Sequence, residues 1–176
     1  AESSASGQDY SIRVVGRGRW QVDALAYVQA RNFSNIVVSS SRFVPVLDQR
    51  NTPSTGLGGK IEVRPPVGDA HTLRLGVDYR RAEGELQEEP ISAFTGQITA
   101  RRRAGGATSD LGLFVEDDWQ VGQLILTGGL RADRTTIADG FFREADANGA
   151  IVIDNRFADR SDWTLTWRAG ALLRAS

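Results

Sequence analysis

Residues 111–133 read LGLFVEDDWQVGQLILTGGLRAD and carry the clearest structural signal in the chain. On both sides of Val121-Gly122 the apolar side chains occupy every second position, with one interruption at Asp117. The apolar positions are Leu111, Leu113, Val115, Trp119, Leu124, Leu126, Leu130 and Ala132. Alternation of this kind is typical of β-strands with one apolar and one polar face, and it fits no helix. We therefore predict an antiparallel hairpin that turns around Val121-Gly122.

The same alternation recurs along the rest of the chain. It covers Trp20–Ala30, Leu57–Pro65, Thr72–Arg81 and Trp163–Leu173, and more weakly Tyr10–Arg17. With the two halves of residues 111–133, these segments make seven predicted strands. Most are about as long as the 9–11 residues with which a tilted strand crosses a bilayer. The sequence therefore predicts an all-β fold.

The links between the predicted strands are alternately short and long. Short links occur at Gly16–Arg19, Pro65–His71 and Gln120–Gln123, and long links at Asn32–Gly56, Ala82–Asp110 and Thr135–Asp162. Outer-membrane barrels have this arrangement, with short periplasmic turns and long outer loops. We predict an antiparallel up-and-down transmembrane β-barrel of about seven or eight strands. Residues 1–176 would form one partial-barrel domain, with long loops at about 32–56, 82–110 and 135–162.

The number of strands bears on whether the barrel is complete. A bacterial single-chain barrel has an even number of strands, so either an eighth strand lies in a long link or the sheet is incomplete. The last residues, Leu172 to Ser176, lack the terminal aromatic residue that small outer-membrane barrels commonly carry. We favour an incomplete sheet, whose two unpaired edges would need strands from elsewhere.

Strand register follows from matching apolar and charged residues across each hairpin. We predict that Trp119 pairs with Leu124. We also predict that Val63 pairs with Leu73, which places Glu62 opposite Arg74, and facing opposite charges are stabilising. The polar face is densely charged, at Glu62, Arg64, Arg74, Asp78, Arg80, Glu116, Asp118, Arg131, Asp133 and Arg168. Such a face suits a water-filled lumen, and it would also suit the outside of a soluble sheet.

The composition narrows the functional classes. The chain has 176 residues, 21 basic and 22 acidic side chains, a net charge of −1 and no cysteine. Absence of cysteine excludes a disulfide scaffold, a thiolate zinc site and a cysteine nucleophile. The balanced charge lacks the basic excess of a nucleic-acid-binding protein. His71 is the only histidine, which excludes a histidine metal cluster, and we expect it to cap a turn.

Three short motifs resemble ligand sites. One is a calcium-loop pattern, Glu144-x-Asp146-x-Asn148-Gly149, but Asn155 stands where such a loop needs a glutamate. We favour a type I′ turn that joins residues 141–144 to 151–154. Residues 56–60, GLGGK, lack the serine or threonine and the following helix of a phosphate loop. Arg101-Arg102-Arg103 could grip an anionic ligand or a lipopolysaccharide phosphate, and we favour a solvated run in a mobile loop.

Adjacent carboxylates and tryptophans complete the candidates. Alternation points Asp117 away from Glu116 and Asp118, so the three cannot share an acid–base site, and the latter two should pair with lumen arginines. The tryptophans fit the aromatic belts at membrane interfaces or the packing of a soluble sheet. They are Trp20, Trp119, Trp163 and Trp167. We predict no catalytic residue, no metal site, no cofactor and no enzyme, and we assign no substrate-binding residue.

The central hairpin also carries a family resemblance. Residues 113–119, LFVEDDW, and 124–133, LILTGGLRAD, resemble the mid-barrel hairpin of TonB-dependent outer-membrane receptors. That family often reads FVQDEW and then LTLTxGLRYD; Glu116, Asp118 and Ala132 differ from the usual Gln, Glu and Tyr. Residues 48–58 and 168–171 also resemble receptor-barrel segments.

The resemblance implies a parent receptor with an N-terminal plug, a TonB-engaging segment and a barrel of about 22 strands. This chain would supply about a third of the wall, without the plug. The parent, in the bacterial outer membrane, would import a scarce ligand such as a ferric siderophore, cobalamin or another metal chelate. Its partners would be outer-membrane lipid, the rest of the barrel and plug, and the TonB system. The alternatives are a complete eight-stranded barrel acting as anchor, adhesin or narrow pore, and a soluble all-β binding module.

Overall fold

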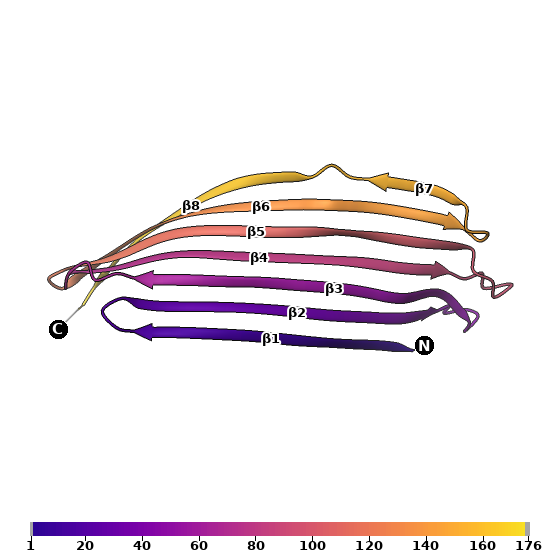
Figure 1. The fold of residues 1–176 in the computed structure, drawn as a ribbon, viewed down its shortest axis with the longest axis horizontal. Helices are drawn as coiled ribbons and strands as arrows, with labels where there is room; N and C mark the ends of the chain where they lie inside the picture. The colour runs from indigo at the N-terminus through magenta and orange to yellow at the C-terminus, as the bar shows by residue number, and fades with distance from the viewer. Residues whose placement is uncertain (1, 175–176) are drawn as a thin grey trace.

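In a computed structural model, residues 2–174 are described and form one antiparallel sheet (Figure 1). Its strands are β1 (Ser3–Arg17), β2 (Gln21–Val38), β3 (Pro45–Arg64), β4 (His71–Pro90), β5 (Ala100–Val121), β6 (Leu124–Asp146), β7 (Ile151–Arg156) and β8 (Arg160–Leu173). Strands β1 to β6 pair in chain order, and β6 pairs with both β7 and β8. The predicted all-β, up-and-down antiparallel architecture is confirmed.

The apolar side chains of the alternating segments share one face of the sheet. Directly paired residues of antiparallel strands lie on the same face, and one such row runs from Val22 through Val63, Leu75 and Val115 to Trp167. We call this face the apolar belt. It comprises Tyr10, Ile12, Val14, Val22, Val28, Leu57, Ile61, Val63, Leu73, Leu75, Val77, Tyr79, Leu111, Leu113, Val115, Trp119, Val121, Leu124, Leu126, Leu130, Trp163, Leu165, Trp167 and Leu173.

At the edge of the sheet that carries the short turns, the strand ends are staggered from β1 to β8. Gly16 of β1 lies level with Trp167 of β8 across the sheet. From there β1 ends at Arg17, whereas β8 continues to Leu173. A staggered register is what closure of a barrel from tilted strands requires. The sheet therefore has the geometry of a barrel wall and not of a flat open sheet.

The three segments predicted as long loops are mostly strand, so that prediction is wrong. The outer connections are only residues 39–44, 91–99 and 147–150, and β5 and β6 are 22 and 23 residues long. We call the strand parts beyond the belt the outer half, residues 31–54, 83–108 and 137–156. Alternation stops there although backbone pairing continues. Strands without alternation and with register shifts near Asn35, Gln49 and Gly105 read as loops from sequence alone.

Both predicted registers are displaced by two residues. Trp119 pairs with Leu126, and Val63 pairs with Leu75. Alternation fixes which face a residue lies on, and a shift of two leaves every face unchanged. In the central hairpin the turn decides the register, because Gly122 has a φ of 61° and begins a two-residue turn that closes Val121 against Leu124.

The last predicted long link contains the short strand β7, which is not an independent eighth strand of the sheet. Strands β7 and β8 run in the same direction and keep the same offset on β6, with Arg156 opposite Phe141 and Arg160 opposite Ile137. They are two parts of one strand, interrupted at residues 157–159 beside Asp139, which has a φ of 57°.

The hairpin predicted to join residues 141–144 to 151–154 forms between β6 and β7. Its turn is not type I′, because Gly149 and not Asn148 has a positive φ.

The sheet is a single layer. Among residues 2–174 the only buried apolar side chains are Ala100 and Ala107, and the belt residues are largely exposed. A soluble β-sandwich needs a second layer over its apolar face, so that alternative is not supported. In the same residues β1 pairs only with β2, and β8 only with β6, which also leaves a closed eight-stranded barrel unsupported. No helix in residues 2–174 is long and apolar enough to cross a membrane.

Candidate functional site

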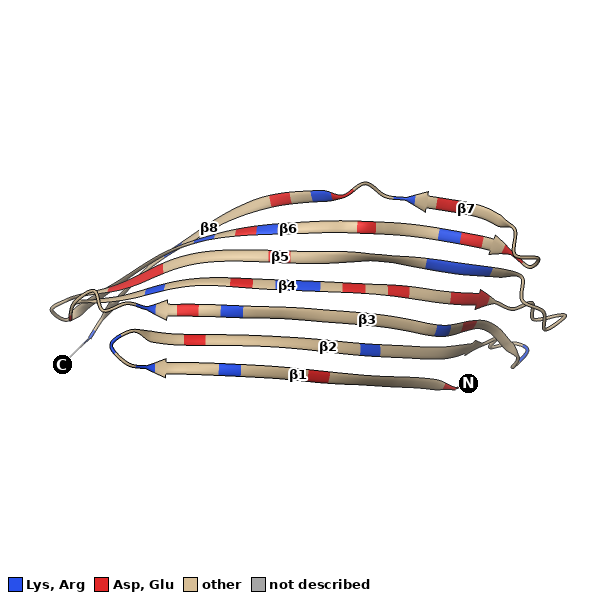
Figure 2. Ribbon diagram, viewed as in Figure 1, with Lys and Arg blue, Asp and Glu red and all other residues tan. Residues whose placement is uncertain are grey.

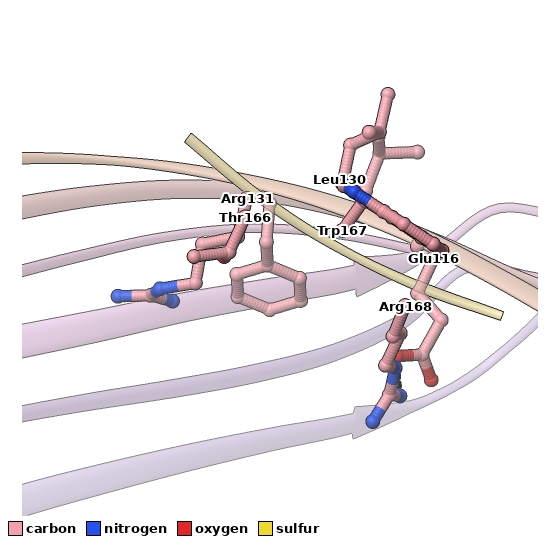
Figure 3. Close-up of a pocket in the computed structure, with 9 residues that line it drawn as sticks. Glu116, Leu130, Arg131, Thr166, Trp167 and Arg168 are labelled. Atoms are coloured by element: carbon pink, nitrogen blue, oxygen red, sulfur yellow. Dashed lines mark ion pairs between the residues drawn. The ribbon is translucent and has the colours of Figure 1, made fainter. Parts of the chain in front are cut away.

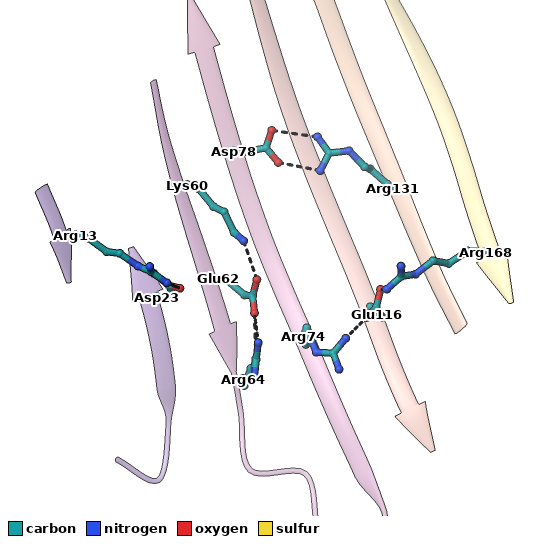
Figure 4. A network of polar contacts seen from close by, with 10 residues as sticks. All are labelled: Arg13, Asp23, Lys60, Glu62, Arg64, Arg74, Asp78, Glu116, Arg131 and Arg168. Carbon is teal, nitrogen blue, oxygen red and sulfur yellow. Dashed lines mark hydrogen bonds and ion pairs between the residues drawn. The ribbon is translucent and has the colours of Figure 1, made fainter. Parts of the chain in front are cut away.

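The face opposite the belt is lined by charged side chains from seven strands, β1 to β6 and β8 (Figures 2 and 4). We call it the charged wall. It comprises Arg13, Asp23, Lys60, Glu62, Arg64, Arg74, Asp78, Glu116, Asp118, Arg131, Asp133 and Arg168. Each residue of this set has an oppositely charged partner within it. The predicted polar face thus carries four separate groups of ion pairs.

Arg131 stands at the centre of the wall and joins two carboxylates. Its guanidinium donates to Asp78 at 2.8 and 3.0 Å and approaches Asp133 at 2.6 Å. The side chain lies flat over Gly112, where any Cβ would collide with it. A planar guanidinium can engage two carboxylate oxygens at once, so this arginine fixes β4 and β6 side chains across the intervening strand.

Arg74 and Arg168 share the carboxylates predicted to meet lumen arginines. Arg74 pairs with Glu116 and lies 2.5 Å from Asp118, and Arg168 pairs with the same Glu116. Figure 3 shows Arg168 beside Glu116 at the β8 edge, where a hollow of about 310 Å³ opens between β5, β6 and β8. The prediction for Glu116 and Asp118 is therefore confirmed.

A third cluster, around Glu62, and a separate ion pair lie toward β1. Glu62 lies between Lys60 at 2.9 Å and Arg64 at 2.8 Å, and Arg13 meets Asp23 at 2.5 Å (Figure 4). These contacts replace the predicted pair of Glu62 with Arg74, because β3 is displaced by two residues on β4. Neutralising its charges pairwise lets the wall border water or a polar domain without a strong field of one sign.

Glycines on the charged wall leave room for aromatic rings to lie flat against the sheet. The Tyr27 ring lies over Gly58, where an added Cβ would be 2.6 Å from the tyrosine hydroxyl. The Phe114 ring covers Gly76 in the same way. Aromatic side chains packed over glycines of a neighbouring strand restore the contact that the glycine lacks. A larger residue at Gly58 or Gly76 would push these rings away from the sheet, so the glycines keep this part of the charged wall flat.

Asp117 points to the apolar belt, away from its two neighbours, as predicted. Its Oδ2 lies 2.6 Å from Nδ1 of His71, and the His71 ring stacks on Trp119 with centroids 5.7 Å apart. Asp117 Oδ1 is buried and has no hydrogen-bond partner in the described residues. His71 begins β4 and pairs across the sheet, so its predicted role in capping a turn is replaced by this contact with a carboxylate.

The arginine run 101–103 lies in strand β5 and not in a mobile loop, which corrects that expectation. Arg102 meets Glu144 at 2.6 Å, and Arg103 donates to both oxygens of Glu85 at 2.8 Å. Hydrogen bonds from Arg103 hold the pKa of Glu85 below its usual range, and Glu85 raises the pKa of Arg103. These arginines are occupied by carboxylates, so the structure offers no open anion site there.

The calcium-like motif forms the turn between β6 and β7. Asp146 Oδ1 accepts backbone hydrogen bonds from Asn148 and Ala150, each at 2.9 Å. Glu144 is paired with Arg102. No group of three or more histidine, cysteine or acidic side chains among residues 2–174 is arranged to hold a metal ion. The GLGGK segment is part of β3.

The tryptophans follow the predicted aromatic belts in part. Trp20 lies in the β1–β2 turn and Trp119 near the end of β5, both at the short-turn edge. Trp163 lies near the opposite boundary, level with Leu111. Trp167 departs from the prediction, since it pairs with Leu130 in the middle of the apolar belt. Three of the four positions thus match an interfacial arrangement.

Sequence analysis missed the residues at the outer turns. Phe43 and Phe94 are 81% and 80% exposed, and the Arg42 guanidinium lies 3.8 Å from the centre of the Phe94 ring. Both turns sit within segments predicted as long loops, where no pattern distinguished one residue from the next. The available signal was a serine at the start of each turn, Ser39 and Ser92.

Comparisons with known proteins agree with this architecture. The family model described as TonB dependent receptor-like, beta-barrel, matches residues 3–176. The ferric yersiniabactin uptake receptor FyuA from Yersinia pestis has a similar structure, with a TM-score of 0.67 and 13% identity over 96% of this chain and 25% of that one. The translocator domain of autotransporter NalP from Neisseria meningitidis has a TM-score of 0.47 and 17% identity over 96% of this chain and 53% of that one. No curated protein sequence matches.

The fraction of the FyuA chain that is matched limits what this similarity shows. This chain spans a quarter of the length of FyuA. At 13% identity the structural likeness concerns the fold and not the ligand. The geometry itself contains two opposed surfaces: an apolar belt that needs a non-aqueous environment, and a charged wall that needs a polar one.

Proposed function

The chain belongs to the TonB-dependent receptor β-barrel family, and we propose that it forms part of the barrel wall of an outer-membrane receptor that imports a scarce small ligand. The ligand would be a metal chelate such as a ferric siderophore, cobalamin or a comparable molecule, and its import would depend on the TonB system. The family is one of receptors. Ligand binding and transport by a receptor need no catalytic residue in the barrel wall.

The observation that supports this proposal is the pairing of the belt with the charged wall on one single-layer sheet. On β5 the belt spans Leu111 to Val121, about the 9–11 residues with which a tilted strand crosses a bilayer. The belt then faces lipid, and the ion-paired wall faces the lumen. The short turns lie in the periplasm, and the outer half of β2–β7 projects outside the cell.

The two edges and the wall each have a partner in this proposal. Strand β1 and the broken strand β7–β8 present backbone groups that must pair within a membrane, and other strands of the parent barrel supply that pairing. The flat, neutralised charged wall accepts the plug domain of the parent. Copies of this chain are the competing source of edge strands.

Cysteine labelling tests the orientation, because this chain has no cysteine of its own. In outer-membrane vesicles of the full-length protein, Leu113→Cys and Leu165→Cys should resist a water-soluble maleimide until detergent is added. In intact cells Ser41→Cys at an outer turn should react, and Val67→Cys at a short turn should not. Ready labelling at both belt positions before detergent would refute the membrane wall.

Uptake tests the transport function. Cells that carry the full-length protein as their sole chelate receptor should accumulate radioactive iron from at least one ferric chelate. Accumulation should stop when TonB is removed or the proton gradient is collapsed. Uptake that continues without TonB contradicts the proposed energy source, and a membrane-embedded protein that transports no chelate contradicts the proposed ligand class.

A further inference from the structure

The outer boundary of the apolar belt carries an arginine on the belt face of the sheet. Leu111, Arg134 and Trp163 pair directly across β5, β6 and β8, so their side chains lie on one face. Arg134 is exposed and has neither an ion pair nor a side-chain hydrogen bond among residues 2–174, whereas Arg131 on the opposite face is held by two carboxylates. A cation without a partner therefore lies where the belt ends.

A row of hydroxyl groups follows directly beyond this arginine. Ser109, Thr136 and Ser161 pair with one another across the same three strands, on the face of Arg134 and two residues further from the belt. Their hydroxyls make no hydrogen bond to any other residue that the structure describes, whereas on the opposite face the Thr135 hydroxyl donates to a carboxylate at 2.8 Å. The guanidinium and the three hydroxyls are therefore available donors on one surface. We call this surface the outer-rim patch, and it comprises Ser109, Arg134, Thr136, Ser161 and Trp163.

The charges around the outer-rim patch favour an anion. Arg81 pairs with Ser109 and so continues the hydroxyl row onto β4. It lies 3.2 Å from Glu83 and 3.6 Å from Asp139, so Arg81 occupies both of these carboxylates and leaves Arg134 uncompensated. A guanidinium with adjacent hydroxyl donors matches the oxygens of a phosphate. The ammonium group of a zwitterionic lipid would meet an unpaired cation instead.

An apolar hollow in the belt adjoins the outer-rim patch. It measures about 530 Å³ and is lined by belt residues of β3, β4, β5, β6 and β8. One row of this lining lies next to the row of Arg134, and it consists of Leu113, Ala132 and Leu165. Apolar surface of this kind is stabilised by contact with hydrocarbon and not with water. The hollow and the patch together fit an amphiphile that has a hydrocarbon chain and a phosphorylated headgroup.

We propose that the outer-rim patch binds the headgroup of a phosphorylated glycolipid of the outer leaflet, with one acyl chain in the adjoining hollow. Arg134 pairs with the phosphate, since a guanidinium can donate two hydrogen bonds to one phosphate group. From Ser109 to Ser161 the hydroxyl row spans two interstrand spacings, about 9.6 Å, which is wider than one phosphate, so the row also offers hydroxyls to a sugar. The lipid reaches this face only if the belt lies in the membrane, so the site rests on the proposed function.

Three lipids separate the phosphate from the sugar and from charge alone. They are lipid A, its enzymatically dephosphorylated form, and phosphatidylglycerol. The purified full-length protein in detergent micelles should bind lipid A more tightly than either of the others, as measured by native mass spectrometry. Arg134→Gln should weaken the binding of lipid A about tenfold and leave that of the dephosphorylated form unchanged. Thr136→Val, which removes a hydroxyl and keeps the shape of the side chain, should weaken lipid A binding about threefold.

Arg160→Gln is the matched control for Arg134→Gln. Arg160 precedes the hydroxyl row by one residue on β8 and pairs with Ile137, so it lies on the opposite face of the sheet, and its loss should leave lipid A binding unchanged. Equal losses in the two variants, equal binding of lipid A and its dephosphorylated form, or tighter binding of phosphatidylglycerol would each overturn the proposal.

The cysteine labelling described above keeps the two proposals distinguishable. If Leu113→Cys is protected from the maleimide and Arg134→Gln still binds lipid A as the wild type does, the lipid site alone is refuted. If the belt cysteines react before detergent is added, the membrane wall itself is refuted, and the lipid site with it.

Discussion

Strand β5 contains two halves that meet different surroundings. From Leu111 to Val121 apolar and polar side chains alternate, whereas from Ala100 to Asp110 the sequence ARRRAGGATSD shows no period. Both halves pair with β4 and β6, with a register shift on β6 between Gly105 and Ala107. On the proposed membrane orientation, the side-chain period records a contrast between two media, lipid and lumen. Backbone pairing needs no such contrast and persists in the outer half, which the proposal surrounds with water.

The comparison predicts its largest effect for a charge placed on the belt. Val115→Arg puts a guanidinium where we expect lipid, level with Leu130 in the middle of the belt, and such substitutions near the midplane of a barrel cost about 2–4 kcal/mol. Val152→Arg in β7 makes a similar change in the outer half, where Val152 is 56% exposed, and should cost less than about 0.5 kcal/mol. Denaturant unfolding of the full-length protein in lipid vesicles measures both.

Either of two results would break the comparison. Equal destabilisation by the two arginines would mean that the outer half also meets lipid. Tolerance of Val115→Arg in vesicles would mean that the belt does not. The free energy of unfolding in vesicles decides between these results without any assay of transport.

The contrast also explains what sequence could predict. Alternation identified the face of each belt residue, because the two faces differ in polarity, and it correctly turned Asp117 away from Glu116 and Asp118. It could not supply the register, since a two-residue shift preserves both faces. It missed the outer half of every long strand, where water on both sides removes the pattern. The residues of the outer turns were missed for another reason. The left-handed backbone at Phe43 is a conformational property that no residue pattern reveals.

The second prediction compares ion pairs in the two halves. Arg131→Met strands the carboxylates of Asp78 and Asp133 and should destabilise the protein by about 1–2 kcal/mol, because both lose a partner on a partly buried wall. Arg143→Met in the outer half leaves only Asp154, in a pair that is 43% and 44% exposed, and should cost less than about 0.5 kcal/mol. Unfolding at low and high salt measures both variants. An Arg143→Met effect as large as that of Arg131→Met would remove the distinction between the two networks.

The third prediction compares the two outer turns. Gly96→Ala should lower the stability of its hairpin by about 1 kcal/mol, because the backbone is left-handed there. The added Cβ would meet no atom within 4 Å, so the cost is purely conformational. Phe43→Gly relieves the same strain and should raise the stability of its hairpin by about 0.5 kcal/mol, the gain being reduced by the greater freedom of glycine in the unfolded chain. Hydrogen exchange of the Ser39 and Ser92 amides measures each turn. Faster exchange in Phe43→Gly would show that the ring stabilises the fold.

The smallest predicted effect is a pH dependence confined to the outer half. Hydrogen bonds from Arg103 lower the pKa of Glu85 in the folded protein. The pair therefore stabilises the fold fully above the unfolded glutamate pKa of about 4.3, and this contribution disappears as the pH falls through the lower folded pKa. Because Arg103 is 54% exposed, we expect it to amount to no more than about 0.5 kcal/mol. Unfolding free energies between about pH 5 and 3 should decline less steeply in Glu85→Gln than in the wild type. Arg103→Met should flatten the decline equally, since either change removes the same pair. A decline that survives in both variants would assign the acid sensitivity to other carboxylates.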